Sequence, residues 1–148
     1  MVASTTLLNS IGPTLAEDAA VHAITDVTGF GLLGHALEMA RGSQLSIIIR
    51  ADALPLLHDA VSLVRDGVVT GASGRNWASY GDSVILPPDF PDWGRNLLTD
   101  PQTSGELLIS CAAERADAIL QQIVAAGYPA AQRIGRTETG PACARIEA

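Results

Sequence analysis

The chain has 148 residues, a net charge of −7 and a mean hydropathy of +0.24. Hydrophobic residues make up 47% of it, which is enough for the core of one domain and too much for a disordered chain. The acidic balance argues against a sequence-independent nucleic-acid binder, and no apolar run reaches the roughly 20 residues that a membrane-spanning helix needs. No basic residue precedes Arg41, so the charged start of a signal peptide is missing and we expect a cytoplasmic protein.

The two cysteines, Cys111 and Cys143, stand in no metal-binding pattern. In an acidic chain without a signal sequence we expect both to be reduced thiols. Cys111 follows an apolar run and is expected to be a buried strand residue. A structural zinc site is therefore not expected.

The N-terminal third begins with an interrupted helical pattern in residues 1–20, broken at Gly12 and Pro13. A short β-branched strand over 21–24 then leads into a turn. The apolar spacing over 30–41 predicts a helix that packs on a sheet, with Gly42 as its C-terminal stop.

The middle third starts with a continuous apolar strand at 45–49, expected to be covered on both faces. Asp52 can cap an amphipathic helix that ends near Gly67 and places His58 on its apolar face. From 69 to 96 the periodicity is lost, and we expect a long irregular stretch with one short helix around Asn76.

The last third is predicted to contain one strand, one helix ended by Gly127, and two further strands separated by a turn at 135–140; these elements span 106–111, 114–126, 131–134 and 142–146. Strands and helices interleave, so the predicted class is α/β or α+β, with helices on a mixed sheet. We expect residues 1–20 to be a helical segment and 21–148 to form a single domain.

The most informative segment is 25–35, where Asp26 ends a predicted strand and a glycine-rich turn opens a helix. Glycines allow a ligand to approach the backbone closely, and the free N–H groups at a helix start favour anions such as phosphate. A carboxylate at the same place is useful if Mg²⁺ lies between it and the phosphate oxygens. The alternative is that Asp26 is a turn or capping residue and the glycines only allow tight packing.

A second polar segment, 100–105, reads DPQTSG and precedes the strand at 106–111. Its small polar side chains could line a pocket at the start of that strand. Taken alone, the segment favours the other interpretation, a turn that leads into the strand.

Together, DVTGFGLLGH at 26–35 and DPQTSG at 100–105 resemble selenophosphate synthetase (selenide, water dikinase). Arg75-Asn76 and Ile134-Gly135 also resemble that family, and the likeness covers nearly the whole chain from Val21. The resemblance implies the C-terminal domain of an aminoimidazole ribonucleotide synthetase-like fold. The complete enzyme would make selenophosphate from selenide, ATP and water, with release of AMP and phosphate.

The resemblance also implies roles for particular residues. Asp26 matches a Mg²⁺-binding aspartate, and Thr28, Gly29 and Gly31 match the turn that would face the phosphates of ATP. The reactive cysteine or selenocysteine and the lysine of the family belong to an N-terminal ATP-binding half. That half is absent here, so no catalytic residue is expected in this chain and the isolated chain should be inactive. The expected partners are ATP, selenide, the N-terminal half and, at full length, a second copy of the enzyme.

Glu106 departs from the family pattern, which has a second glycine after TSG. A carboxylate there either points to solvent or adds negative charge next to an anion site. Three alternatives therefore stay open: an ATP- or anion-binding module, an inactive relative, and another ATP-dependent enzyme of the same superfamily, of the ring-closing synthetase or hydrogenase maturation type.

Other polar and aromatic residues are predicted to be structural. His35 is expected to be hydrogen-bonded inside the fold rather than to phosphate, and Asn76 to fix its loop through side-chain to backbone bonds. The four aromatic residues of the middle stretch are expected either to cover it or to pack on another subunit or the missing half: Trp77, Tyr80, Phe90 and Trp93.

Overall fold

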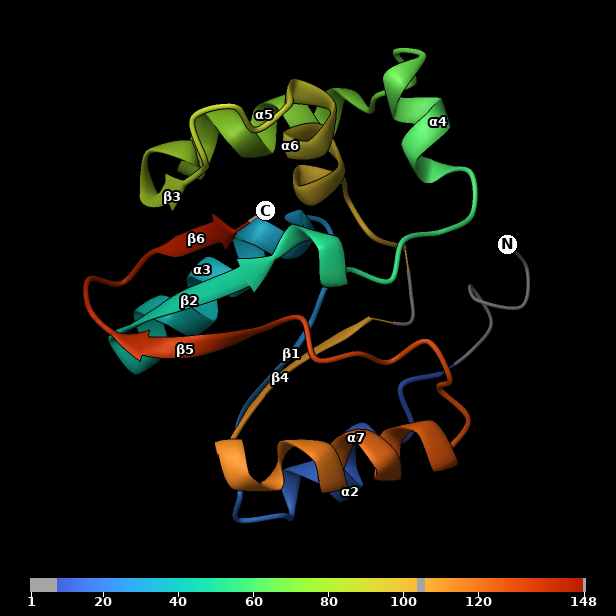
Figure 1. The fold of residues 1–148 in the computed structure, drawn as a ribbon, viewed down its shortest axis with the longest axis vertical. Helices are drawn as coiled ribbons and strands as arrows, with labels where there is room; N and C mark the ends of the chain where they lie inside the picture. The colour runs from blue at the N-terminus through green and yellow to red at the C-terminus, as the bar shows by residue number, and fades with distance from the viewer. Residues whose placement is uncertain (1–7, 104–105, 148) are drawn as a thin grey trace.

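The computed structural model describes residues 8–103 and 106–147. Its strands form two sheets (Figure 1). One is the antiparallel pair of β1 (Val21–Asp26) and β4 (Leu107–Cys111). The other has the order β3-β6-β2-β5, built from β3 (Val84–Ile85), β6 (Ala144–Glu147), β2 (Leu45–Arg50) and β5 (Gly135–Thr139). β2 runs parallel to β6 and antiparallel to β5, so the predicted mixed sheet is confirmed.

The helices lie in two groups (Figure 1). α5 and α6 lie together beyond one edge of the four-stranded sheet, whereas α2 and α7 lie at the far end of the β1–β4 pair. The bounds are α2 (Gly12–Ala16), α3 (Gly31–Ser43), α4 (Ala60–Arg65), α5 (Gly71–Tyr80), α6 (Asp92–Thr99) and α7 (Ala116–Ala125), with 3-10 turns at Ala51–Ala53, Gly81–Ser83 and Ala113–Arg115. No helix in the described ranges is long and apolar enough to cross a membrane.

The core lies between α3 and the four-stranded sheet. Leu33 and Leu37 are one helical turn apart and are buried, as are Ile49 of β2 and Ile146 of β6. Each such side chain contributes about 1.5–3 kcal/mol through removal of its surface from water. This packing fixes the direction of α3 and therefore the position of its first turn. Only residues 27–30 separate that first turn from β1.

The end of α3 differs from the prediction. Gly42 lies inside the helix, and Gln44 is the cap, with a left-handed φ of 57° and an N–H that donates to the Ala40 carbonyl. The side-chain amide of Gln44 also donates to the Arg41 carbonyl at 2.7 Å. That local bond helps a residue other than glycine to hold this conformation.

The amphipathic helix predicted to end near Gly67 is much shorter, because α4 has only six residues. Pro55 disfavours helical geometry in the residue before it, and Leu54 is extended, with ψ 131°. His58 therefore lies outside the helix with its side chain 96% exposed and hydrogen-bonded to Asp59, so the prediction that it lies on the apolar face of a helix is wrong.

The stretch predicted to be irregular contains two helices, α5 and α6. The short helix expected around Asn76 is present and spans ten residues. Its sequence has little apolar periodicity because its buried face carries Ser73 and Asn76 beside Tyr80. Polar side chains can be buried there because they form hydrogen bonds with α6 and the loops, which periodicity in sequence does not reveal.

The C-terminal strands are also shifted from the prediction. The predicted turn at 135–140 contains β5, and the strand expected at 131–134 lies before it, outside any strand. A Cβ on Gly135 would lie 1.9 Å from the Ile48 carbonyl oxygen, so glycine allows β5 to pair closely with β2. Cys143 is buried and Cys111 is half-buried, and both are free thiols.

Candidate functional site

Asp26 is the last residue of β1, and its side chain is exposed to solvent. The side-chain amide of Asn9 donates to its Oδ1 at 2.9 Å, which orients one carboxylate oxygen. The N–H of the next residue, Val27, donates to the Glu106 carbonyl and continues the pairing with β4. The strand pair therefore holds Asp26 at its end, at the start of the glycine-rich turn.

The turn requires glycine at position 31. Gly31 has a φ of +67°, and a Cβ there would lie 2.7 Å from the carbonyl carbon of Thr99 and 2.9 Å from the Asp100 carbonyl oxygen. Gly29 is different, because a Cβ there would meet nothing within 4 Å. Gly31 is thus needed for backbone packing inside the protein, whereas Gly29 leaves open space outside it.

The two sequence motifs meet in space. The Gln102 N–H donates to the Thr28 carbonyl at 3.0 Å, and Gly31 lies against the backbone of Thr99 and Asp100. The turn after β1 and the segment that leads into β4 therefore form one structural unit, although they are about 70 residues apart in the chain.

Asn76 of α5 joins this unit to the helices. Its side-chain Nδ2 donates to the Gly29 carbonyl and to the Thr99 carbonyl, both at 2.9 Å, and the side chain is buried. The prediction that Asn76 fixes a loop through side-chain to backbone bonds is confirmed. The sequence indicated one loop, whereas the structure shows that Asn76 links the glycine-rich turn to Thr99, the residue directly before the second motif.

A further link, which sequence reasoning missed, starts at Thr70. Its hydroxyl donates to Asp100 Oδ1 at 2.7 Å and accepts from the Ser73 N–H at the start of α5. Below it, the buried hydroxyls of Ser73 and Thr99 are 2.7 Å apart. A threonine just before a helix indicates a cap in sequence, but its bond to Asp100 depends on the fold.

His35 is buried on the first turns of α3, and its Nε2 accepts the Thr28 N–H at 3.0 Å. Because Nε2 accepts, the proton of the neutral ring is on Nδ1, which lies 3.2 Å from Thr25 Oγ1 and from Glu38 Oε2. The expectation of an internally hydrogen-bonded histidine is confirmed. Its role is to hold the backbone of the turn.

The turn directs its N–H groups in two directions. The N–H of Thr28 is used by His35, and that of Gly31 by the Thr28 carbonyl. The N–H groups of Gly29 and Phe30 have no acceptor among the described residues, and both residues are exposed. Two backbone donors at the start of α3 are therefore accessible to an anion.

Metal-binding capacity is limited in this part of the protein. Within residues 8–103 and 106–147, no group of three or more His, Cys, Asp or Glu side chains could hold a metal ion. Asp26 offers one exposed carboxylate. Mg²⁺ in nucleotide sites is usually held by one or two carboxylates together with water and substrate phosphates. One such ligand fits a shared site and does not form a complete one.

Glu106 is exposed and lies directly before β4, where its carbonyl accepts the N–H of Val27. Partial loss of hydration around its carboxyl raises the pKa above the usual value. The raised pKa means that the charged form of Glu106 is disfavoured at the position where the family pattern has glycine. The side chain lies at the surface of the protein and not in its interior.

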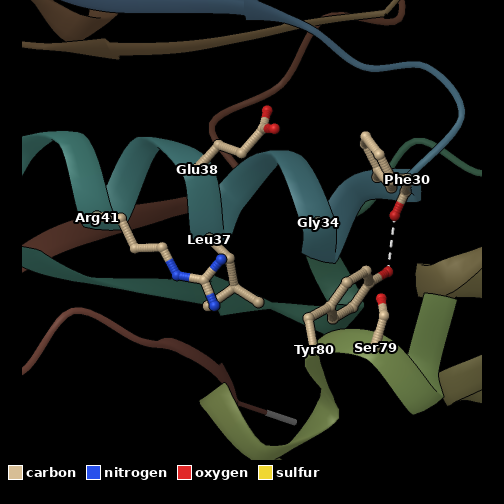
Figure 2. A pocket seen from close by; sticks show the side chains of 7 residues that line it. All are labelled: Phe30, Gly34, Leu37, Glu38, Arg41, Ser79 and Tyr80. Atoms are coloured by element: carbon tan, nitrogen blue, oxygen red, sulfur yellow. Dashed lines mark hydrogen bonds between the residues drawn. The ribbon is translucent and has the colours of Figure 1, made fainter.

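A hollow of about 190 Å³ lies between α3 and α5, next to the turn (Figure 2). Phe30, Gly34 and Tyr80 line it, and the Tyr80 hydroxyl donates to the Phe30 carbonyl at 2.7 Å. Burial raises the pKa of Tyr80 to about 12, so this donor keeps its proton at neutral pH. A second hollow, of about 250 Å³, is lined by Arg50, Arg133 and Arg136. Both are smaller than typical small-molecule sites, and neither could enclose a nucleotide.

The aromatic residues of the middle stretch serve as cover. Trp77, Phe90 and Tyr80 pack on the core, and the Arg95 guanidinium lies 5.3 Å from the centre of the Trp77 ring. Trp93 lies under the Arg65 guanidinium at 4.4 Å. These contacts agree with the expected role of covering the middle stretch of the chain.

Comparison with known proteins agrees with this geometry. Residues 7–146 match the family described as AIR synthase related protein, C-terminal domain. The chain is 58% identical over 146 residues to the selenide, water dikinase of Rhizobium meliloti (strain 1021), covering 99% of this chain and 42% of that enzyme. It is 52% identical over 140 residues to the enzyme of the same name from Paraburkholderia xenovorans (strain LB400), covering 95% of this chain and 40% of that one.

The chain thus spans about two fifths of the length of the curated relatives that it matches. A solved structure of thiamine-monophosphate kinase from Stenotrophomonas maltophilia K279a aligns with a TM-score of 0.57 at 23% identity, covering 87% of this chain and 32% of that protein. This likeness agrees with the expected fold, and the family match extends across the two motif segments. The chain belongs to the AIR synthase related protein, C-terminal domain family.

Proposed function

We propose that this chain forms the C-terminal part of a selenide, water dikinase, which makes selenophosphate from selenide, ATP and water with release of AMP and phosphate. The 58% identity to an enzyme of that name, across 99% of the chain, is the observation that carries this proposal. The meeting of 26–35 with 100–103 supports it, because the segments that carry the resemblance form one structural unit.

In this proposal Asp26 supplies one ligand to Mg²⁺. Its carboxylate is exposed, is oriented by Asn9, and stands at the start of a turn whose free N–H groups face the same solvent. Mg²⁺, when bound, would neutralise phosphate charge. Without it, the negative charge of Asp26 would repel a phosphate group.

The residues of the turn would then divide the binding of phosphate between them. Gly29 provides the close approach, because nothing lies within 4 Å of where its Cβ would be, and its N–H and that of Phe30 can donate. Thr28 and Gly31 hold the shape of the turn through bonds inside the protein. Of the three residues that the resemblance assigns to ATP, Gly29 would make direct contact through its backbone.

The proposed site is completed by a second polypeptide segment. Among the described residues, the exposed carboxylate of Asp26 and a shallow hollow do not form a complete site for Mg²⁺ and ATP, and this chain has no lysine for phosphoryl transfer. We assign the catalytic residues to the N-terminal half of the enzyme, with selenide as the second substrate and a homodimer as the full-length state. The isolated chain should not turn over ATP.

The test is a chimera that joins this chain to the part of the Rhizobium meliloti enzyme that it does not match. We expect the chimera to produce selenophosphate and AMP from selenide and Mg-ATP, and the isolated chain to produce neither. Asp26→Asn, which can still accept from Asn9, should lower the apparent Mg²⁺ affinity of the chimera at least roughly 10-fold.

The matched control is Asp89→Asn, which removes an exposed carboxylate from the turn before α6. It should leave the activity and the Mg²⁺ dependence of the chimera unchanged. Equal effects of the two substitutions would contradict the role of Asp26. Product formation by the isolated chain would contradict the need for another half.

A further inference from the structure

Exposed apolar side chains are concentrated between β2 and α5. Five large apolar residues there are exposed: Leu56 (46%), Leu57 (60%), Leu63 (49%), Val68 (63%) and Val69 (41%). We call this the 56–69 surface. The other exposed large apolar side chains among the described residues are single residues elsewhere: Leu8, Phe30, Ile85 and Val124. Single exposed apolar residues are ordinary, whereas a group on one segment indicates a surface that is covered in the working protein.

The backbone brings the two ends of this segment to α4. The Leu57 carbonyl accepts from the Ala60 N–H at 3.0 Å where the helix begins, and the Leu63 carbonyl accepts from the Val68 N–H at 3.0 Å after it ends. Val64 is buried against the rest of the domain while Leu63 is exposed. α4 stands at the edge of the molecule, away from the four-stranded sheet (Figure 1). The segment is folded, and it presents apolar groups outward.

The 56–69 surface adjoins the candidate site. Val69 is followed by Thr70, whose hydroxyl donates to Asp100 Oδ1 and which caps α5. Asp100 in turn lies against Gly31 in the glycine-rich turn. A protein segment that covered the 56–69 surface would therefore be separated from the edge of the site only by the hydrogen-bonded pair of Thr70 and Asp100.

We propose that the 56–69 surface is the docking site for the N-terminal half of the enzyme. This inference rests on the proposed function. Two observations favour that half as the occupant. More than half of the length of the relatives lies outside the matched region, and the described residues of the site next to the surface do not supply a complete set of metal ligands. Docking here would bury the exposed leucines and valines and place the second half beside Asp100 and the turn.

Amide hydrogen exchange tests this assignment without relying on activity. Deuterium uptake is compared between the 148-residue chain and the chimera with the Rhizobium meliloti enzyme. We expect the amides of 56–69 to exchange at least roughly 10-fold more slowly in the chimera. Peptides from α7 should exchange equally in both. Equal uptake at 56–69 in the two proteins would overturn the proposal.

Substitutions then separate docking from folding. The double variant Leu57→Asn, Val68→Asn changes only exposed side chains, so the 148-residue chain that carries it should unfold at the same urea concentration as the wild type. In the chimera it should abolish the slowed exchange at 56–69. The control Val124→Asn, at an exposed apolar position of α7, should not. Retained protection in the double variant would contradict the proposal.

Three further outcomes are distinguished by the same proteins. If sedimentation shows that the 148-residue chain dimerises and that the double variant does not, the occupant is a second copy and the proposal is wrong. An active chimera with unprotected 56–69 would overturn the docking site alone. A protected but inactive chimera would overturn the proposed function alone.

Discussion

Two glycines in the turn after β1 have different physical roles although they are two residues apart. Gly31 has a positive φ and lies against the backbone of Thr99 and Asp100, whereas Gly29 has open space around it and an accessible N–H. The first is required by the fold and the second by the proposed ligand. A sequence pattern of glycines cannot separate these two reasons, because both appear as the same residue type.

Gly31→Ala should destabilise the chain by about 2–4 kcal/mol, because it adds a strained φ to a Cβ clash with backbone atoms that cannot move aside. Gly29→Ala should change the free energy of unfolding by no more than about 0.5 kcal/mol. Urea unfolding of both variants measures this difference. Equal losses of stability would mean that Gly31 does not pack as described.

Among the elements, β5 and β6 are joined across the strand that separates them. β2 lies between them in the sheet, and Arg136 of β5 makes two hydrogen bonds, both 2.9 Å, to the carboxylate of Glu147 in β6. Arg136 also donates to Glu138 at 2.7 Å. The hydrogen bonds from Arg136 to Glu147 lower the pKa of Glu147 below its usual value. The polar sequence of β5 is thus compatible with a strand because its charges are paired on the exposed face.

The lowered pKa of Glu147 predicts a pH dependence of stability. The carboxylate binds fewer protons in the folded than in the unfolded chain, so its stabilisation is present above the usual pKa near 4.5 and is lost as pH falls through the lower folded value. Glu147→Gln should therefore lose less stability than the wild type on acidification through this range. The difference should shrink at high salt, because the pair is exposed. Urea unfolding at several pH values, with and without 1 M salt, tests both statements. Parallel pH profiles would contradict the pairing.

For the whole molecule, Asn76 is the point where three parts of the chain are joined. It belongs to α5 and donates to the carbonyl of Gly29 in the turn after β1 and to that of Thr99 at the end of α6. A single buried amide therefore joins α5, the glycine-rich turn and the end of α6, beside the bonds that Gln102 and Tyr80 make to the same turn. Buried hydrogen bonds of this kind fix the relative positions of the segments that they join, and they also stabilise the fold.

Asn76→Ala should lower the free energy of unfolding by about 2–3 kcal/mol, because it leaves two carbonyl oxygens unsatisfied next to a buried gap. It should also speed amide exchange in the turn at 28–31. Asn96→Ala, at a half-buried position of α6, is the control and should cost no more than about 0.5 kcal/mol. Equal losses in the free energy of unfolding of the two variants would contradict the proposed structural role of Asn76.

Much of the fold could be predicted from local pattern. The β-branched run of β2 and the apolar periodicity of α3 and α7 are determined by burial, which leaves a regular trace in sequence. The prediction that His35 is hydrogen-bonded inside the fold is also confirmed, whereas the binding roles assigned to the motif at 26–35 stay predictions. The confirmed predictions succeeded because each depends on residues that are close in the chain.

The remainder was decided by tertiary structure. α5 has a buried face of small and polar residues, and β5 is a polar strand held by pairing with β2, so neither leaves an apolar period in sequence. The contacts of Gly31 with Asp100 and of Thr70 with the same residue join positions 30 or more residues apart. By itself, the sequence determined the fold class, the strand that ends at Asp26 and the motif that follows it. Only the tertiary structure decided which N–H groups of the turn face outward, because the packing of Gly31 against Thr99 and Asp100 sets the path of the turn, in which His35 and the Thr28 carbonyl accept the other two N–H groups.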